Sequence, residues 1–128
     1  MRRSSVVCLT GLVMLSDAAL AQSYTVAADH QARVYYTYST NPDCTSFGQV
    51  IVRLTQAPQH GRVTIRNATV YPNFPASNIR SVCNRRRVPG VEAHYIPERG
   101  YTGPDSVSFE TIFPDGLYRQ STATISVR

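Results

Sequence analysis

Beyond residue 21, apolar and polar side chains alternate over short stretches, and the spacing typical of amphipathic helices is nearly absent. Strict alternation over a few residues is typical of a β-strand with one buried face. The pattern predicts strands at Arg33–Tyr38, Gln49–Thr55, Gly61–Arg66, Val91–Tyr95, Ser106–Phe113 and Ser121–Val127. A further strand is expected near the N terminus, at Ser23–Ala28.

Turn-forming residues separate these strands, among them Asn41-Pro42-Asp43, Pro89-Gly90 and Pro114-Asp115-Gly116. Short alternating strands with frequent turns predict an all-β fold, an antiparallel sandwich of two sheets and about seven strands. The polar face of each strand is then the outer face of a sheet. The segment of about 67–90 has little alternation and three prolines, so we expect a long loop there.

Tyrosines are concentrated in the strand predicted at Arg33–Tyr38. Alternation places Tyr36 and Tyr38 on the buried face and Tyr35 on the outer face. An aromatic platform that stacks on sugar faces is an alternative use of such rings, and Tyr71 and Phe74 could extend it.

The N-terminal segment has the pattern of a secretory signal peptide. Arg2 and Arg3 precede a mostly apolar run, Val6–Leu15, and Ala19-Leu20-Ala21 places small residues at the positions that a signal peptidase reads. We therefore expect residues 1–21 to be removed and residues 22–128 to form one exported domain, in the periplasm or outside the cell. The apolar run is too short to span a membrane.

Removal of the signal peptide would take Cys8 with it and leave Cys44 and Cys83. An oxidising compartment permits a disulfide, and two cysteines have one internal pairing. No second Cys or His stands at metal-ligand spacing from either one, and there is no Cys-x-x-Cys. We expect a structural Cys44–Cys83 disulfide.

From about Arg53 to Arg128 the chain resembles the bacterial immunoglobulin-like domains of tandem-repeat surface and adhesion proteins. The matching residues are Leu54 with Ala57-Pro58 and Gly61-Arg62-Val63, Tyr95-Ile96-Pro97, the run Gly100–Phe109, Asp115-Gly116 and Ser121–Val127. The resemblance implies an immunoglobulin-like sandwich in a single copy and says nothing of a ligand. It does not cover the segment between Asn67 and Val91.

The same resemblance gives a structural meaning to the run Gly100-Tyr101-Thr102-Gly103-Pro104-Asp105. Gly100 and Gly103 permit positive φ in a tight turn, Tyr101 is expected to pack beneath it, and Asp105 can accept hydrogen bonds from its backbone N–H groups. Some relatives hold calcium between repeats, but a calcium site needs more oxygens than this turn supplies, and no metal is expected.

Charge is the strongest chemical signal outside the strands. The chain carries 13 basic and 8 acidic residues, and every basic residue is arginine. Arg85, Arg86 and Arg87 follow Cys83 closely and could bind an anion or a partner, because each guanidinium fork matches a carboxylate or phosphate. The alternative is a solvated loop. Nucleic acid is not an expected partner of an exported protein.

No catalytic centre is evident. There is no Gly-x-Ser-x-Gly, and the acidic residues fall mostly on turns and outer faces. His30, His60 and His94 lie too far apart in the sequence to form a local metal motif, and only folding could bring them together. We expect a non-catalytic binding or adhesion module without a cofactor that recognises an envelope protein or an anionic surface polysaccharide. The alternative is a periplasmic metal-handling protein or small enzyme that uses the three histidines.

Overall fold

The computed structural model describes residues 20–128, so the predicted signal peptide lies outside the described residues except for its last two. The described residues form seven strands and one short 3₁₀ helix. Their bounds are β1 Leu20–Val26, β2 Ala32–Tyr38, β3 Ile51–Gln56, β4 Gly61–Val70, η1 Ile79–Arg85, β5 Val88–Pro97, β6 Gly103–Ile112 and β7 Tyr118–Val127.

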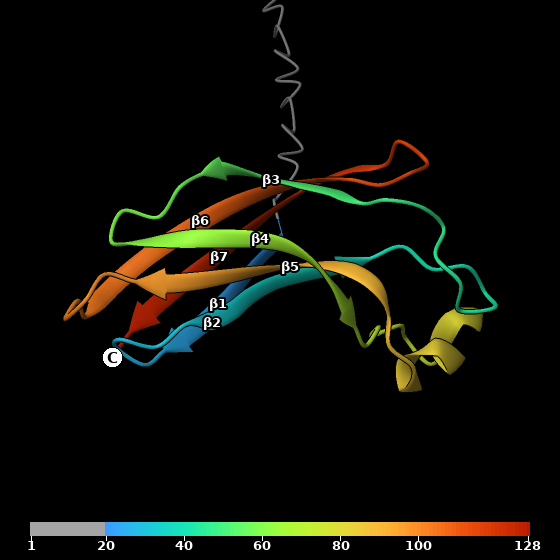
Figure 1. Ribbon diagram of the computed structural model, residues 1–128, viewed down its shortest axis with the longest axis horizontal. Coiled ribbons are helices and arrows are strands. Elements are labelled where there is room, and N and C mark those ends of the chain that lie inside the picture. Colours follow the sequence, from blue (N-terminus) through green and yellow to red (C-terminus); the bar gives the residue numbers. More distant parts are fainter. Residues whose placement is uncertain (1–19) are drawn as a thin grey trace, which may run out of the picture.

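The strands form two sheets that lie face to face (Figure 1). One sheet has the order β1-β7-β6-β3 and the other the order β2-β5-β4. The predicted seven-stranded, two-sheet β-sandwich is confirmed. One pairing departs from the antiparallel prediction, because β1 runs parallel to β7 from Leu20↔Ser121 to Val26↔Val127.

The core lies between the sheets and is built from the inward side chains of five strands. Tyr95 and Phe109 are its largest members, and both are almost completely buried. The remaining members are smaller: Val26, Val34, Ala93, Val107, Ala123, Ile125 and Val127. Alternation in β5, β6 and β7 places the core residues of these three strands on their inward faces, as the sequence pattern predicts.

The prediction for the tyrosines of β2 is wrong. Tyr35 points into the sandwich, where its ring stacks on Phe109 with centroids 4.9 Å apart. Tyr36 lies on the outer side of β2, with the Arg33 guanidinium 4.3 Å from its ring centroid. The cause is a register shift between Arg33 and Tyr35 in the pairing with β5, because one extra residue reverses the side-chain alternation that follows it.

The predicted loop of about 67–90 is shorter than expected. β4 continues to Val70 and β5 already begins at Val88, because these two ends pair with each other. The excursion from the sandwich is therefore residues 71–87, and it contains η1. No helix in the described residues is long and apolar enough to cross a membrane.

The Cys44–Cys83 disulfide is confirmed, with the two Cα atoms 5.4 Å apart. Cys83 is fully buried and lies on η1, whereas Cys44 lies in the loop between β2 and β3. The disulfide joins two long connections at one end of the sandwich, the end opposite the C terminus (Figure 1).

Opening the disulfide is expected to destabilise the fold. In the chain-entropy model a loop of this length contributes about 4 kcal/mol. We expect the Cys44→Ser/Cys83→Ser variant to unfold at a clearly lower urea concentration than the oxidised protein. Dithiothreitol should bring the unmodified protein to the midpoint of the variant and leave the variant itself unchanged. Equal midpoints with and without the bridge would contradict this prediction.

Candidate binding cleft

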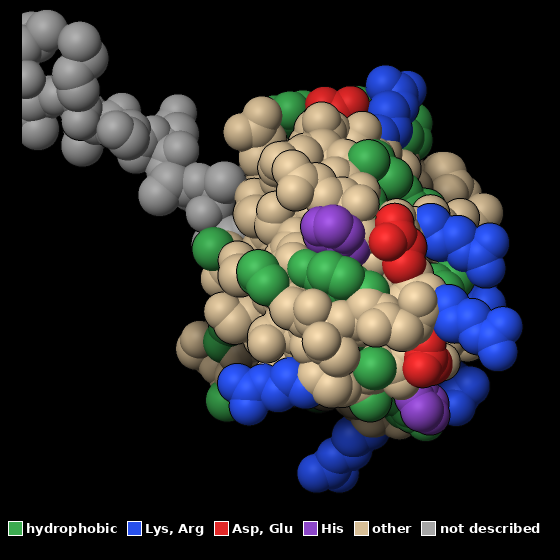
Figure 2. Space-filling model, turned by 90° about the vertical axis from the view of Figure 1, so that its left-hand side faces the viewer, with side chains coloured by type: hydrophobic (Ala, Val, Ile, Leu, Met, Phe, Trp, Pro, Cys, Tyr) green, Lys and Arg blue, Asp and Glu red, His purple; other side chains and the backbone are tan. Residues whose placement is uncertain are grey.

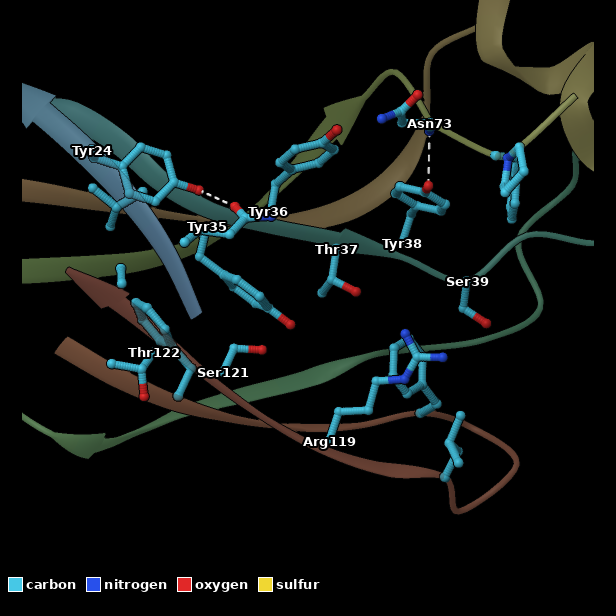
Figure 3. Close-up of a pocket in the computed structure, with 18 of the residues that line it drawn as sticks. Tyr24, Tyr35, Tyr36, Thr37, Tyr38, Ser39, Asn73, Arg119, Ser121 and Thr122 are labelled. Carbon is cyan, nitrogen blue, oxygen red and sulfur yellow. Dashed lines mark hydrogen bonds between the residues drawn. The ribbon is translucent and has the colours of Figure 1, made fainter. Parts of the chain in front are cut away.

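A cleft of about 670 Å³ opens between the two sheets, along β2 on one side and β7 on the other (Figure 3). Tyr24 of β1 lies at one end of the cleft and Asn73 of the excursion at the other. Phe74 and Asn78 of the excursion also line the cleft. Its volume is in the range of small-ligand sites, which are commonly about 300–1,000 Å³.

Hydroxyl groups from both sheets are directed into the cleft. Figure 3 shows the side chains of Thr37 on β2 and of Ser39, just after β2, turned toward β7, and Ser121 on the opposite wall. Thr122 also borders the cleft, but its hydroxyl pairs with that of Ser108, 3.0 Å away, on the outer face of its own sheet. A serine or threonine hydroxyl both donates and accepts hydrogen bonds, so the hydroxyls of Thr37, Ser39 and Ser121 can pair with those of a ligand.

Arg119 supplies the positive charge of the cleft. Its guanidinium carbon lies 5.5 Å from the centroid of the Phe113 ring, an arrangement that orients the fork. Within the described residues, no carboxylate lies within ion-pair distance of Arg119. Asp115 is the single acidic residue among those that line the cleft, and its carboxylate accepts a hydrogen bond from the backbone N–H of Leu117, 3.0 Å away.

Aromatic rings border the cleft along the outer side of β2. The Tyr36 and Tyr38 ring centroids lie 6.2 Å apart, and Tyr38 meets Phe74 edge to face at 5.1 Å. The Tyr38 hydroxyl accepts a hydrogen bond from the backbone N–H of Asn73 at 2.8 Å. Burial raises the pKa of the Tyr38 hydroxyl, and also that of Tyr24, so both rings stay neutral at physiological pH.

The cleft residues were not found from the sequence. Thr37, Ser39, Arg119, Ser121 and Thr122 stand on two segments about eighty residues apart and form no local motif. Only the packing of the two sheets brings them together. Sequence reasoning did single out Tyr36, Tyr38 and Phe74, but it placed the two tyrosines on the wrong face of β2.

The arginine run does not line the cleft. Arg85 ends η1, Arg86 follows it with extended backbone, and the Arg87 guanidinium carbon lies 5.4 Å from the ring centroid of Tyr71. All three side chains are exposed. Within the described residues, no carboxylate lies within ion-pair distance of any of them.

Other arginines lie on the outer face of the β2-β5-β4 sheet and are paired with acidic groups. The carboxylate of Glu92 lies 3.2 Å from Arg33, 3.8 Å from Arg66 and 3.0 Å from His94. The hydrogen bond with His94, followed by that from Arg33, lowers the pKa of Glu92 against the opposing effect of burial. Figure 2 looks at the end of the sandwich that carries the C terminus and shows basic side chains along one side with acidic ones among them.

The three histidines lie apart from one another in the fold. His30 lies in the turn after β1 and bonds the carbonyl of Ala28, while His94 is on the outer face of β5. His60 stacks on Tyr101, with ring centroids 4.2 Å apart. Within residues 20–128 the structure contains no cluster of three His, Cys, Asp or Glu side chains that could hold a metal ion.

The Gly100–Asp105 run covers the end of the turn between β5 and β6 and the first residues of β6. Gly100 and Gly103 have φ angles of 77° and 131°, and the Tyr101 hydroxyl donates a hydrogen bond to the carbonyl of Pro104 at 2.5 Å. The Asp105 carboxylate reaches a different turn from the one that sequence reasoning considered. It accepts hydrogen bonds from the N–H groups of Gln59 at 2.9 Å and His60 at 3.0 Å, between β3 and β4.

Asp105 accepts two further hydrogen bonds, from its neighbour Ser106 N–H at 2.9 Å and from the buried Tyr95 hydroxyl at 2.7 Å. Burial by itself would raise the pKa of the Asp105 carboxyl, but the hydrogen bonds from Tyr95, Gln59, His60 and Ser106 outweigh it and lower the pKa. Burial and the adjacent Asp105 carboxylate raise the pKa of Tyr95. This is a structural network at the end of the sandwich opposite the disulfide.

Comparisons with known proteins supply no family. No protein-family description matches the chain, and no curated protein matches it in sequence. The solution structure of amebosin is similar to this chain with a TM-score of 0.43 and 10% sequence identity, over 87% of this chain and 99% of amebosin.

The Asp105 network predicts how stability depends on pH. The pKa of Asp105 is lower in the folded state than in the unfolded chain, so the folded state binds fewer protons. The stabilisation is therefore complete above the unfolded pKa and is lost as the pH falls through the folded pKa. We expect Asp105→Asn to cost about 3 kcal/mol at neutral pH, because three N–H groups and a hydroxyl lose a charged acceptor.

The measurement is urea unfolding of the unmodified protein, Asp105→Asn and the exposed control Asp115→Asn from neutral pH down to the acid limit. The stability difference between Asp105→Asn and the unmodified protein should shrink as the pH falls, whereas Asp115→Asn should follow the unmodified protein. A pH-independent cost of Asp105→Asn would show that the charge of the carboxylate is not what stabilises the two turns.

Proposed function

We propose that this chain is an exported, non-catalytic binding module of the bacterial immunoglobulin-like type, and that its cleft holds a segment of an anionic surface polysaccharide. The signal-peptide pattern of residues 1–21 and the Cys44–Cys83 disulfide support export to an oxidising compartment. The motifs around Tyr95-Ile96-Pro97 and Gly100–Phe109 support the proposed family, and the two-sheet sandwich agrees with it.

The observation that carries the ligand class is the composition of the cleft. Sugars present hydroxyls in many directions, and the hydroxyls of Thr37 and Ser39 on one wall and Ser121 on the other can meet them. Arg119 adds a fork that can accept a carboxylate or sulfate in two parallel hydrogen bonds. Tyr36, Tyr38 and Phe74 border this polar strip with ring faces and edges.

Binding is favoured over hydrolysis by the acidic residues. Most glycoside hydrolases use two carboxyl groups on either side of the scissile bond. Of the described residues that line the cleft, only Asp115 is acidic, and its carboxylate already accepts the N–H of Leu117 within its own turn. A single acidic residue in such a turn fits a binding site better than a hydrolytic one.

Processing of the signal peptide would also expose part of the edge of β7. β1 begins at Leu20, so cleavage after Ala21 would remove the partners of Ser121 and Thr122 in the parallel pairing with β7. The backbone of β7 at Ser121 and Thr122 would then be free at its edge. The mature cleft would offer main-chain as well as side-chain hydrogen bonds.

We expect Arg119→Gln to weaken binding to polygalacturonate, a polyuronate, by about tenfold, because a hydrogen bond to a charged group contributes about 1.5 kcal/mol. Isothermal titration calorimetry on the oxidised protein measures the affinity, and added salt should reduce it. The control Arg62→Gln removes the same charge from the exposed outer part of β4 and should retain binding. The neutral glucan dextran should bind more weakly than polygalacturonate.

Equal losses of affinity in Arg119→Gln and Arg62→Gln would mean that polygalacturonate binds through the net charge of the protein and not in the cleft. Absence of polysaccharide binding combined with cross-links from β2 to an envelope protein would contradict the proposal. It would favour instead a protein partner that adds a strand at the edge of the β2-β5-β4 sheet.

Export into a bacterial periplasm should yield a protein whose first residue is Gln22 and whose mass is lower by two hydrogens than that of the reduced chain. Mass spectrometry of the intact protein checks both. Ala21→Asp should block processing, because a signal peptidase requires a small residue there, whereas Ala27→Asp, just past β1, should leave processing unchanged. Retention of residues 1–21 in the exported protein would contradict the predicted cleavage.

A further inference from the structure

The most exposed large apolar side chains of the described structure lie together on η1. Ile79 is 71% exposed and Val82 is 65% exposed, although the helix is held firmly to the rest of the molecule by the Cys44–Cys83 disulfide. These two aliphatic side chains do not pack in the core, although the helix that carries them is held in a fixed position. Their exposure points to a contact outside the molecule.

The geometry of a 3₁₀ helix explains how η1 presents these residues. With three residues per turn, side chains three positions apart lie in line, so η1 has three lines of side chains. In the first line, Cys83 forms the disulfide and Arg80 donates from Nε to the carbonyl of Thr40 at 2.8 Å. In the second, the Asn84 side chain makes two hydrogen bonds, each 2.9 Å long, to the backbone of Phe74.

The third line consists of Ile79, Val82 and Arg85, and all three are exposed. Two lines of the helix thus attach it to the protein, and the remaining line faces solvent with two aliphatic side chains followed by a basic one. Arg86 and Arg87 continue directly from this line and are also exposed. We call Ile79, Val82 and Arg85–Arg87 the η1 tip.

The charge around the η1 tip is of one sign. Residues 44–91 contain seven arginines and neither aspartate nor glutamate. Within the described part of the chain, no carboxylate lies within ion-pair distance of Arg85, Arg86 or Arg87. The tip therefore combines exposed aliphatic side chains with guanidinium groups that have no acidic partner, at the end of the sandwich farthest from the C terminus (Figure 1).

We propose that the η1 tip docks the protein on an anionic phospholipid surface, with Ile79 and Val82 inserted among the headgroups and Arg85–Arg87 bound to lipid phosphates. Apolar side chains that enter the interface and arginines that meet anionic headgroups are the two contributions that hold peripheral proteins on membranes. Two aliphatic side chains are few for a protein–protein interface, which needs about 800 Å² on each partner. They suffice for a shallow insertion that adds to electrostatic attraction.

The test is sedimentation with vesicles, using oxidised protein recovered after export. Vesicles of phosphatidylglycerol and phosphatidylcholine in equal parts should bind the protein, and vesicles of phosphatidylcholine alone should not. Arg85→Gln/Arg86→Gln/Arg87→Gln should weaken binding by about tenfold or more, since each arginine near the surface contributes to attraction. Ile79→Ser/Val82→Ser should weaken it as well, with thermal unfolding unchanged because both side chains are already exposed.

The matched control is Arg62→Gln/Arg99→Gln/Arg128→Gln. It removes the same charge from the opposite end of the sandwich, where the start of β4 pairs with the end of β5 and the start of β6 pairs with the end of β7. This control should bind the anionic vesicles within about twofold of the unmodified protein, because charges farther than about a Debye length from the surface are screened.

Equal losses in the two triple variants would overturn the proposal, because binding would then follow net charge. Full binding by Ile79→Ser/Val82→Ser would also overturn it. So would failure to bind anionic vesicles, including the case in which the tip cross-links to an envelope protein. The vesicles carry no polysaccharide, so failure of the proposed cleft ligand leaves this result unaffected.

Discussion

The Asp105 carboxylate holds the two sheets together at one end of the sandwich, and the arrangement of the whole molecule depends on it. Asp105 belongs to β6 in one sheet, and Tyr95, which donates to it, belongs to β5 in the other. Gln59 and His60, whose N–H groups it also binds, form the turn that leads from β3 in the first sheet to β4 in the second. A buried charge is costly unless its hydrogen bonds are satisfied, and four donors satisfy this one. The spacing of the sheets at this end is therefore fixed.

At the other end of the sandwich the sheets are joined differently. There the disulfide connects the excursion of residues 71–87 to the loop between β2 and β3, and it does not join one sheet directly to the other. The sheets can diverge along β2 and β7, and the cleft lies between them. Tyr35 limits this divergence from inside, because its ring stacks on Phe109 and its hydroxyl bonds Thr111 of β6. The Asp105 network holds the two sheets together at one end, whereas within the described residues no such contact joins β2 to β7 along the neighbouring edge. The cleft lies along that edge.

The sequence allowed the strands to be predicted because alternation is a local property, and each strand of the sandwich has one apolar face. Local alternation failed at β2, where the register shift between Arg33 and Tyr35 reversed Tyr35, Tyr36 and Tyr38. A bulge depends on pairing with another strand, here β5. Its position therefore cannot be predicted from the alternation of apolar and polar residues within β2. The same limit applied to Asp105, whose turn partners lie some forty-five residues away. The disulfide could be predicted since two cysteines have one pairing, whereas the cleft required the packing of both sheets.

The disulfide also explains how η1 can be ordered with so little apolar burial. A short 3₁₀ helix is not stable alone, and of the η1 residues only Cys83 is buried. The covalent link and the hydrogen bonds of Arg80 and Asn84 replace the hydrophobic contacts that hold most helices in place. Because these contacts use two of the three lines of side chains, the third line makes no contact within the described residues that the fold requires. The third line, Ile79, Val82 and Arg85, can therefore be selected for a contact outside the protein. Because its support is rigid, this contact can form without the entropic cost of ordering a loop.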